Sequence, residues 1–123
     1  MDYTDKRRHK RVFFSKGDQV TGEIHRPGAG DGSFSAVVLD ISESGIGVTL
    51  SREKMVSDLQ VGDRLILKSI QGIPAIESDE YIEMEVRWVL NVSFLDHIGF
   101  GCKFKVIPDS ARDRIRLIVE VAQ

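Results

Sequence analysis

The sequence predicts an all-β fold that ends in one C-terminal helix, arranged as a six-stranded antiparallel barrel. Two observations carry this prediction. Apolar and polar residues alternate with a period of two through most of the chain, and clusters of Gly and Asp interrupt that alternation at short, regular intervals. Only the segment after Pro108 changes to helical spacing. Six short strands of this kind are typical of a small barrel.

Six segments carry the strand pattern. They are 19–26 (QVTGEIHR), 34–42 (FSAVVLDIS), 46–50 (IGVTL), 64–70 (RLILKSI), 80–91 (EYIEMEVRWVLN) and 97–105 (HIGFGCKFK). The glycine-rich segment 27–33 is expected to be a flexible hairpin connection, and the longer segment 51–63 a connection with one helical turn.

The C-terminal helix is expected to follow Pro108, with Asp109 or Ser110 as its cap. Its apolar residues form one stripe that must pack on the barrel: Ala111, Ile115, Ile118, Val119 and Ala122.

Length and composition narrow the class of protein. The 123 residues suffice for one domain with its own hydrophobic core. Cys102 is the only cysteine, and the three histidines are dispersed, so neither a disulfide framework nor a metal site is predicted. The first residues are charged and no apolar run reaches the length of a membrane span, so we expect a soluble, cytoplasmic protein.

Positive charge is concentrated near the start of the chain. Five of the seventeen Lys and Arg residues lie in KRRHKR, 6–11, which leaves twelve basic and nineteen acidic residues elsewhere. We expect residues 1–11 to be a flexible basic arm and 12–123 to be the barrel with its helix. The arm should become ordered when a ligand binds it.

Within the arm, Arg7 and Arg11 are four residues apart and Arg8 follows the first. The planar guanidinium group suits phosphate oxygens and the O6/N7 edge of guanine, whereas lysine supplies charge without that geometry. The alternative is a solvated basic tail that binds any polyanion weakly.

A second polar segment is LDISESGIG, 39–47. In an extended chain Val37, Leu39 and Ile41 point one way, so Asp40 and Ser42 are expected to share the opposite surface. Asp40 could accept hydrogen bonds from the N1 and N2 edge of guanine, with Ser42 donating or accepting nearby. Gly45 fits a turn that needs positive φ or a close approach to a ligand. The alternative is an ordinary polar hairpin.

Two residues of the later strands have ambiguous roles. Trp88 is in phase with Met84, Val86 and Leu90, which favours a place in the core, but a tryptophan near the barrel rim could instead stack on a base. Cys102 is in phase with apolar neighbours and is expected to be buried.

The two motifs together resemble the PilZ domain family. Arg7 and Arg11 match its paired arginines, Arg8 the frequent additional one, and Asp40, Ser42 and Gly45 its DxSxxG motif, and the resemblance extends over nearly the whole chain. It implies that these residues bind cyclic di-GMP, with Trp88 as a further candidate contact.

The resemblance also implies that the protein is a receptor rather than an enzyme. Such a receptor would transmit changes in the concentration of the second messenger to an unidentified protein partner. No catalytic constellation is found in the sequence, and neither nucleic acid nor membrane is expected as a partner. Two alternatives remain open: a PilZ-like interaction module with a silent nucleotide site, and a small barrel that binds single-stranded nucleic acid. The sequence leaves open the oligomeric state and whether one or two cyclic di-GMP molecules are bound.

Overall fold

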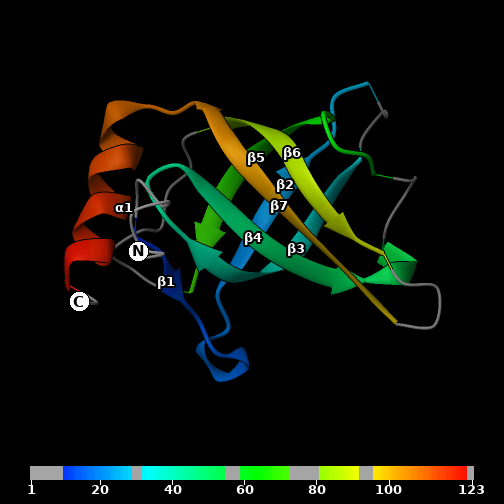
Figure 1. Cartoon of the computed structure of the whole chain (residues 1–123), viewed down its shortest axis with the longest axis horizontal. Coiled ribbons are helices and arrows are strands. Elements are labelled where there is room, and N and C mark those ends of the chain that lie inside the picture. The colour runs from blue at the N-terminus through cyan, green and yellow to red at the C-terminus, as the bar shows by residue number, and fades with distance from the viewer. Residues whose placement is uncertain (1–9, 29–31, 55–58, 73–80, 92–95, 122–123) are drawn as a thin grey trace, which may run out of the picture.

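A computed structural model describes residues 10–28, 32–54, 59–72, 81–91 and 96–121 (Figure 1). Most of the predicted arm, residues 1–9, lies outside this part of the chain. The strands are β1 (Val12–Phe13), β2 (Thr21–His25), β3 (Ser33–Ile41), β4 (Gly45–Ser51), β5 (Arg64–Gln71), β6 (Ile82–Leu90) and β7 (His97–Val106). The helices are two short 3₁₀ turns, η2 (Lys16–Asp18) and η3 (Arg52–Lys54), and α1 (Asp109–Val121).

The strands form one antiparallel sheet in the order β1-β3-β2-β5-β6-β7-β4. An additional pairing between β3 and β4 closes strands β2 to β7 into the predicted six-stranded barrel. The nine residues of β3 make this closure possible, because its first half pairs with β2 and its second half with β4. The two-residue strand β1 was not predicted, and it adds to β3 at Asp40 and Ile41.

The interior of the barrel is apolar. Phe100, Val48 and Val86 have no exposed surface, and Ser42 is the only buried polar residue in the described part of the chain. The largest fully buried side chains come from every strand of the barrel and from α1, and include Phe100, Ile24, Ile41, Ile46, Leu65, Ile82 and Ile115. The alternation that predicted the strands therefore reports a real division between core and surface.

That division differs from the prediction in two strands, and a β-bulge is the cause in each. In β3 the pairing with β4 passes from Val38 directly to Asp40, and in β6 the pairing with β7 passes from Val86 directly to Trp88. Each strand thus contains one extra residue, which reverses the faces of the residues that follow.

The bulges overturn several predicted faces. Val37 and Leu39 were expected to point the same way as Ile41, but both are exposed whereas Ile41 is buried. Trp88 and Leu90 were expected in phase with buried Met84 and Val86, but both are exposed.

The helix α1 lies at one end of the barrel (Figure 1). Ala111, Ile115 and Val119 are buried and Ile118 packs against the core, as the predicted stripe requires, while Ala122 lies outside the described residues. No helix in the described ranges has the length and apolar content to cross a membrane.

Cys102 gives a direct test of the core. Burial raises the pKa of its thiol from 9.0 to about 12. Because the thiolate is the reactive form, we expect a disulfide reagent such as DTNB to label native protein at pH 8 at least about a hundredfold more slowly than unfolded protein. Equal labelling rates with and without denaturant would contradict the buried position.

The same shift gives a pH dependence. Between pH 9.0 and about 12 only the unfolded thiol ionises, so this group contributes stability below pH 9 that is lost as the pH rises through that window. A Cys102→Ala variant should lack this part of the alkaline decrease in the free energy of unfolding, measured by denaturant titration.

Candidate functional site

The two polar segments that the sequence singled out meet on the outer surface of the barrel. Asp40 follows the bulge of β3, and its carboxylate points outward with 17% of the side chain exposed. Arg11, one residue before β1, places its guanidinium against this carboxylate, with Nη1 donating to Oδ1 at 2.5 Å. The pairing of β1 with β3 explains the contact, since it aligns Val12 with Ile41 and Phe13 with Asp40.

A row of residues crosses four strands next to this ion pair. The register aligns Asp40 of β3 with Gly47 of β4, Gly47 with Gly101 of β7, and Gly101 with Trp88 of β6. Residues paired in this way project their side chains to the same face. Since the two central positions are glycines, no side chain projects from the middle of the row, which has a carboxylate at one end and an indole at the other.

Each glycine makes room for its neighbour. A Cβ atom at Gly47 would lie 3.1 Å from Oδ2 of Asp40, and one at Gly101 would overlap the indole nitrogen of Trp88. The indole extends toward Gly99 as well, at ordinary contact distance from a Cβ placed there. Trp88 therefore lies across the outside of β7, with 45% of its surface exposed.

Ser42 has a different place from the one predicted. It was expected to share a surface with Asp40, but it is fully buried. Its hydroxyl accepts hydrogen bonds from the amides of Ser44 (3.1 Å) and Gly45 (3.2 Å), and its own amide donates to the carbonyl of Gly45 at 2.9 Å. Ser42 thus holds the turn between β3 and β4 from the inside.

Gly45 does not have the positive φ that was one of the two predicted reasons for glycine at this position. It is not among the described residues with positive φ, and what approaches it closely is the protein itself. A Cβ atom at Gly45 would overlap the carbonyl oxygen of Cys102 on β7. The close contact of β4 with β7 therefore requires glycine here.

Sequence reasoning missed one cation on this face. Lys103 of β7 is exposed, is two residues beyond Gly101 and pairs with Gly45 in the sheet. Lys105 forms an ion pair with Glu85, whereas Lys103 makes no ion pair with a described residue. The alternation of IGFGCKFK could have identified it, because Gly99, Gly101 and Lys103 alternate with buried residues.

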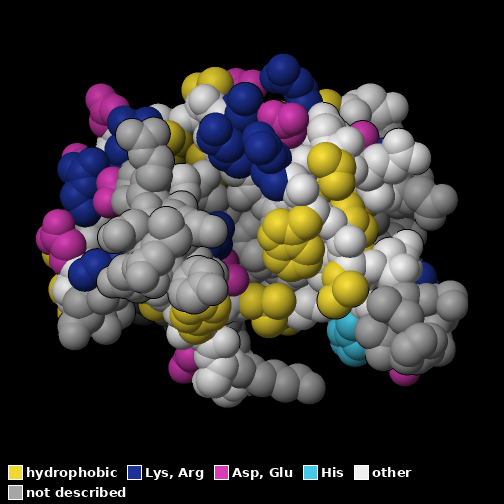
Figure 2. Space-filling view, viewed as in Figure 1, with side chains coloured by type: hydrophobic (Ala, Val, Ile, Leu, Met, Phe, Trp, Pro, Cys, Tyr) yellow, Lys and Arg dark blue, Asp and Glu magenta, His cyan; other side chains and the backbone are white. Residues whose placement is uncertain are grey.

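Figure 2 shows hydrophobic side chains spread over the face that β3, β4 and β7 present, with a group of Lys and Arg side chains beside them. Arg7 and Arg8 belong to the predicted site but lie outside the described residues. Within the described ranges no cluster of His, Cys, Asp and Glu has the arrangement of a metal site.

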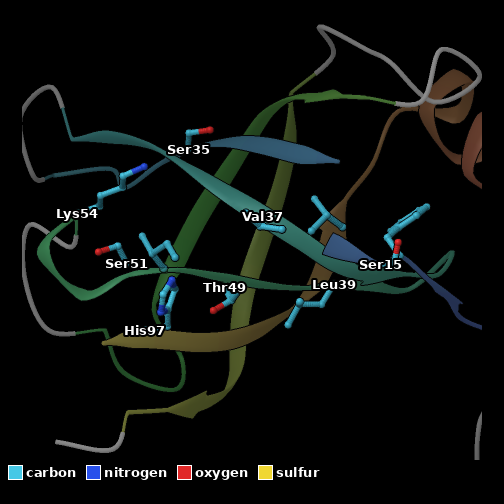
Figure 3. A pocket seen from close by; sticks show the side chains of 11 residues that line it. Ser15, Ser35, Val37, Leu39, Thr49, Ser51, Lys54 and His97 are labelled. Carbon is cyan, nitrogen blue, oxygen red and sulfur yellow. The ribbon is translucent and has the colours of Figure 1, made fainter. Parts of the chain in front are cut away.

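A groove of about 410 Å³ runs along β3 and β4 beside this face (Figure 3). Val37, Leu39 and Thr49 line its middle, with Lys54 and His97 at one end and Ser15 toward the other. None of Arg11, Asp40 and Trp88 belongs to its wall. Arg11, Asp40 and Trp88 thus lie on an open surface rather than in the groove.

The family assignment follows from comparison with known proteins. The model of the family described as PilZ domain matches residues 5–120. The chain belongs to the PilZ domain family. PilZ domains are receptors for cyclic di-GMP and not enzymes. A comparison with curated proteins found no match.

Solved structures show the same PilZ fold. The complex of K. pneumonia MrkH with c-di-GMP superposes with a TM-score of 0.70 at 17% identity, over 93% of this chain and 51% of that one. The PilZ domain of YcgR from Escherichia coli, with c-di-GMP, gives 0.66 at 12% identity, over 95% and 91%. The Bacillus subtilis inhibitor of motility, MotI/DgrA, gives 0.61 at 20% identity, over 94% and 49%. The chain spans about half the length of MrkH and MotI.

The position of Trp88 on the PilZ barrel can be tested with two glycine variants. Gly101→Ala should displace the indole, because the new methyl group would occupy its place, and the emission of this single tryptophan should shift toward the red. Gly99→Ala is the matched control, since its methyl group would make an ordinary contact at 3.7 Å. Identical emission spectra for Gly101→Ala and the parent would contradict this placement.

Proposed function

We propose that this PilZ domain is a cytoplasmic receptor for cyclic di-GMP that passes ligand level to a protein partner. The observation that carries the proposal is the contact between Arg11 and Asp40. It unites the two motif segments on one outward face, beside the glycine-floored row that ends at Trp88.

The residues of this face match the chemistry of the ligand. Cyclic di-GMP has two phosphates and two guanine bases, so it needs cationic donors, acceptors for the guanine edge and a flat apolar surface. Arg11 supplies a guanidinium, and Lys103 a second cation from β7. The half-exposed indole of Trp88 offers a stacking surface, which typically contributes about 1–3 kcal/mol for each base.

Asp40 can serve the base while it holds Arg11. A carboxylate has about four acceptor positions on its two oxygens. Nη1 of Arg11 occupies one of them on Oδ1, which leaves Oδ2 for the N1 and N2 donors of guanine. The ion pair thus prepares Arg11 on the barrel face before a phosphate arrives, and this lowers the entropy cost of binding.

Ser42 and Gly45 act indirectly in this proposal. Ser42 organises the turn from inside, and Gly45 lets β4 lie against β7. Both keep Asp40 and Gly47 in register, so substitutions at these positions would reduce binding by altering the surface rather than by removing a contact.

The relatives support the proposal at the level of the fold. MrkH and YcgR share the barrel and were solved with c-di-GMP, at identities of 17% and 12%. The residues named above extend that likeness to a ligand site in this chain.

Binding is tested by titration calorimetry with cyclic di-GMP, with linear pGpG and GTP as controls. Arg11→Ala should weaken binding by at least about tenfold, because a charge-assisted hydrogen bond typically contributes roughly 1.5–3 kcal/mol. Arg11→Lys should restore only part of the affinity, since the charge remains but the planar fork is lost.

Arg64→Ala is the matched control for that titration. It removes one exposed positive charge from β5, which is not part of the candidate face. An equal loss of affinity in both alanine variants would mean that Arg11 contributes only nonspecific positive charge. No binding by the parent would favour an interaction module with a silent nucleotide site.

The arm was predicted to become ordered over residues 1–11, but Arg11 already contacts Asp40 without ligand, and residues 1–9 lie outside the described part of the chain. We propose that ligand phosphates bring Arg7 and Arg8 onto the face where Arg11 already lies, and so change the surface that a partner meets. Backbone amide relaxation by NMR, with and without cyclic di-GMP, should show that residues 6–9 become rigid in the complex. Equal relaxation in both states would rule out ordering as the signal.

A further inference from the structure

The turn that links β3 to β4 is held from three sides. From inside, the hydroxyl of Ser42 accepts hydrogen bonds from the amides of Ser44 and Gly45. From β7, the amide of Phe104 donates to the carbonyl of Ser44 at 2.8 Å. From outside, Glu43 at the tip of the turn accepts a hydrogen bond from Nε of Arg116 at 3.0 Å.

Arg116 belongs to α1 and to neither sequence motif. It follows Ile115, whose side chain is buried against the barrel, so the packing of the helix fixes the position of the Arg116 backbone. Its Nη1 also lies 3.6 Å from Asp113 on the same helix, and Glu120 is a further nearby carboxylate. Glu43 is the better partner, because it lies closer and is only 21% exposed.

We propose that Arg116 is a positioning residue for the cyclic di-GMP site, and that it acts by clamping the turn 42–45 through Glu43. The functional half of this inference rests on the proposed function. The turn closes the hairpin in which Asp40 on β3 pairs with Gly47 on β4.

Register is the property that the clamp controls. The β3–β4 pairing contains a bulge just before Asp40, so the outward position of Asp40 depends on where the extra residue lies in the strand. A shift by one residue would turn Asp40 away from the outer face. Holding the tip of the turn disfavours such a shift, so the binding-competent arrangement stays populated.

Arg116→Ala tests the clamp in the intact chain. Hydrogen exchange without nucleotide should become faster at the amides of Ser44 and Gly45. The amide of Gly62 lies in the connection before β5 and donates to the carbonyl of Val86 on β6, and its exchange rate should be unchanged. Affinity for cyclic di-GMP should fall about two- to fivefold, the range by which an exposed ion pair shifts a local equilibrium.

Arg112→Ala is the matched control. It removes the same charge from the same helix, together with an ion pair to Asp109 at 3.8 Å that does not reach the turn. Exchange at Ser44 and Gly45 and the affinity should both stay at parent values. Glu43→Gln combined with Arg116→Ala should be no worse than Arg116→Ala alone, because the two changes break one interaction.

The outcomes separate this inference from the proposed function. If the parent fails to bind cyclic di-GMP, the proposed function is wrong, and exchange alone decides whether Arg116 holds the turn. If the parent binds but Arg116→Ala and Arg112→Ala give the same exchange and affinity, the positioning role is overturned while the receptor function stands.

Discussion

The candidate site depends on two β-bulges. One extra residue follows buried Val38 in β3 and another follows buried Val86 in β6, and these turn Asp40 and Trp88 onto the outer face. Alternation continued unbroken from Val38 and Val86 would place both side chains inside. The glycines between them lower the floor of the row, so that an acceptor and a stacking surface face a common space. The arrangement of Asp40 and Trp88 on one outer face therefore follows from the two bulges.

The electrostatics of the candidate face are local. The ion pair between Arg11 and Asp40 neutralises the carboxylate and fixes a guanidinium beside it. Lys103 adds an exposed cation on β7, two residues along the strand from Gly101. The favourable charge is therefore local, which lets the rest of the surface remain acidic.

The environments of the motif residues differ from one position to the next. Asp40 and Arg11 present charged groups to solvent, whereas Ser42 is buried in the turn and Gly45 is required by contact with β7. The hydrogen bond from Arg116 to Glu43 also links this turn to α1. The hairpin end that bears the candidate site is thus tied to the core, to a neighbouring strand and to the helix.

Sequence reasoning correctly predicted the all-β class, all six barrel strands to within about two residues of their observed ends, the C-terminal helix with its buried stripe, and the burial of Cys102. These features follow from local periodicity, which one strand or one helix expresses alone. It also identified Arg11 and Asp40 as partners in one site, through the family pattern. Only the tertiary structure decided which way Val37, Leu39, Trp88 and Leu90 point, because a bulge exists only in relation to a neighbouring strand. For the same reason the burial of Ser42 and the contact between Glu43 and Arg116 emerge only once segments distant in sequence lie side by side.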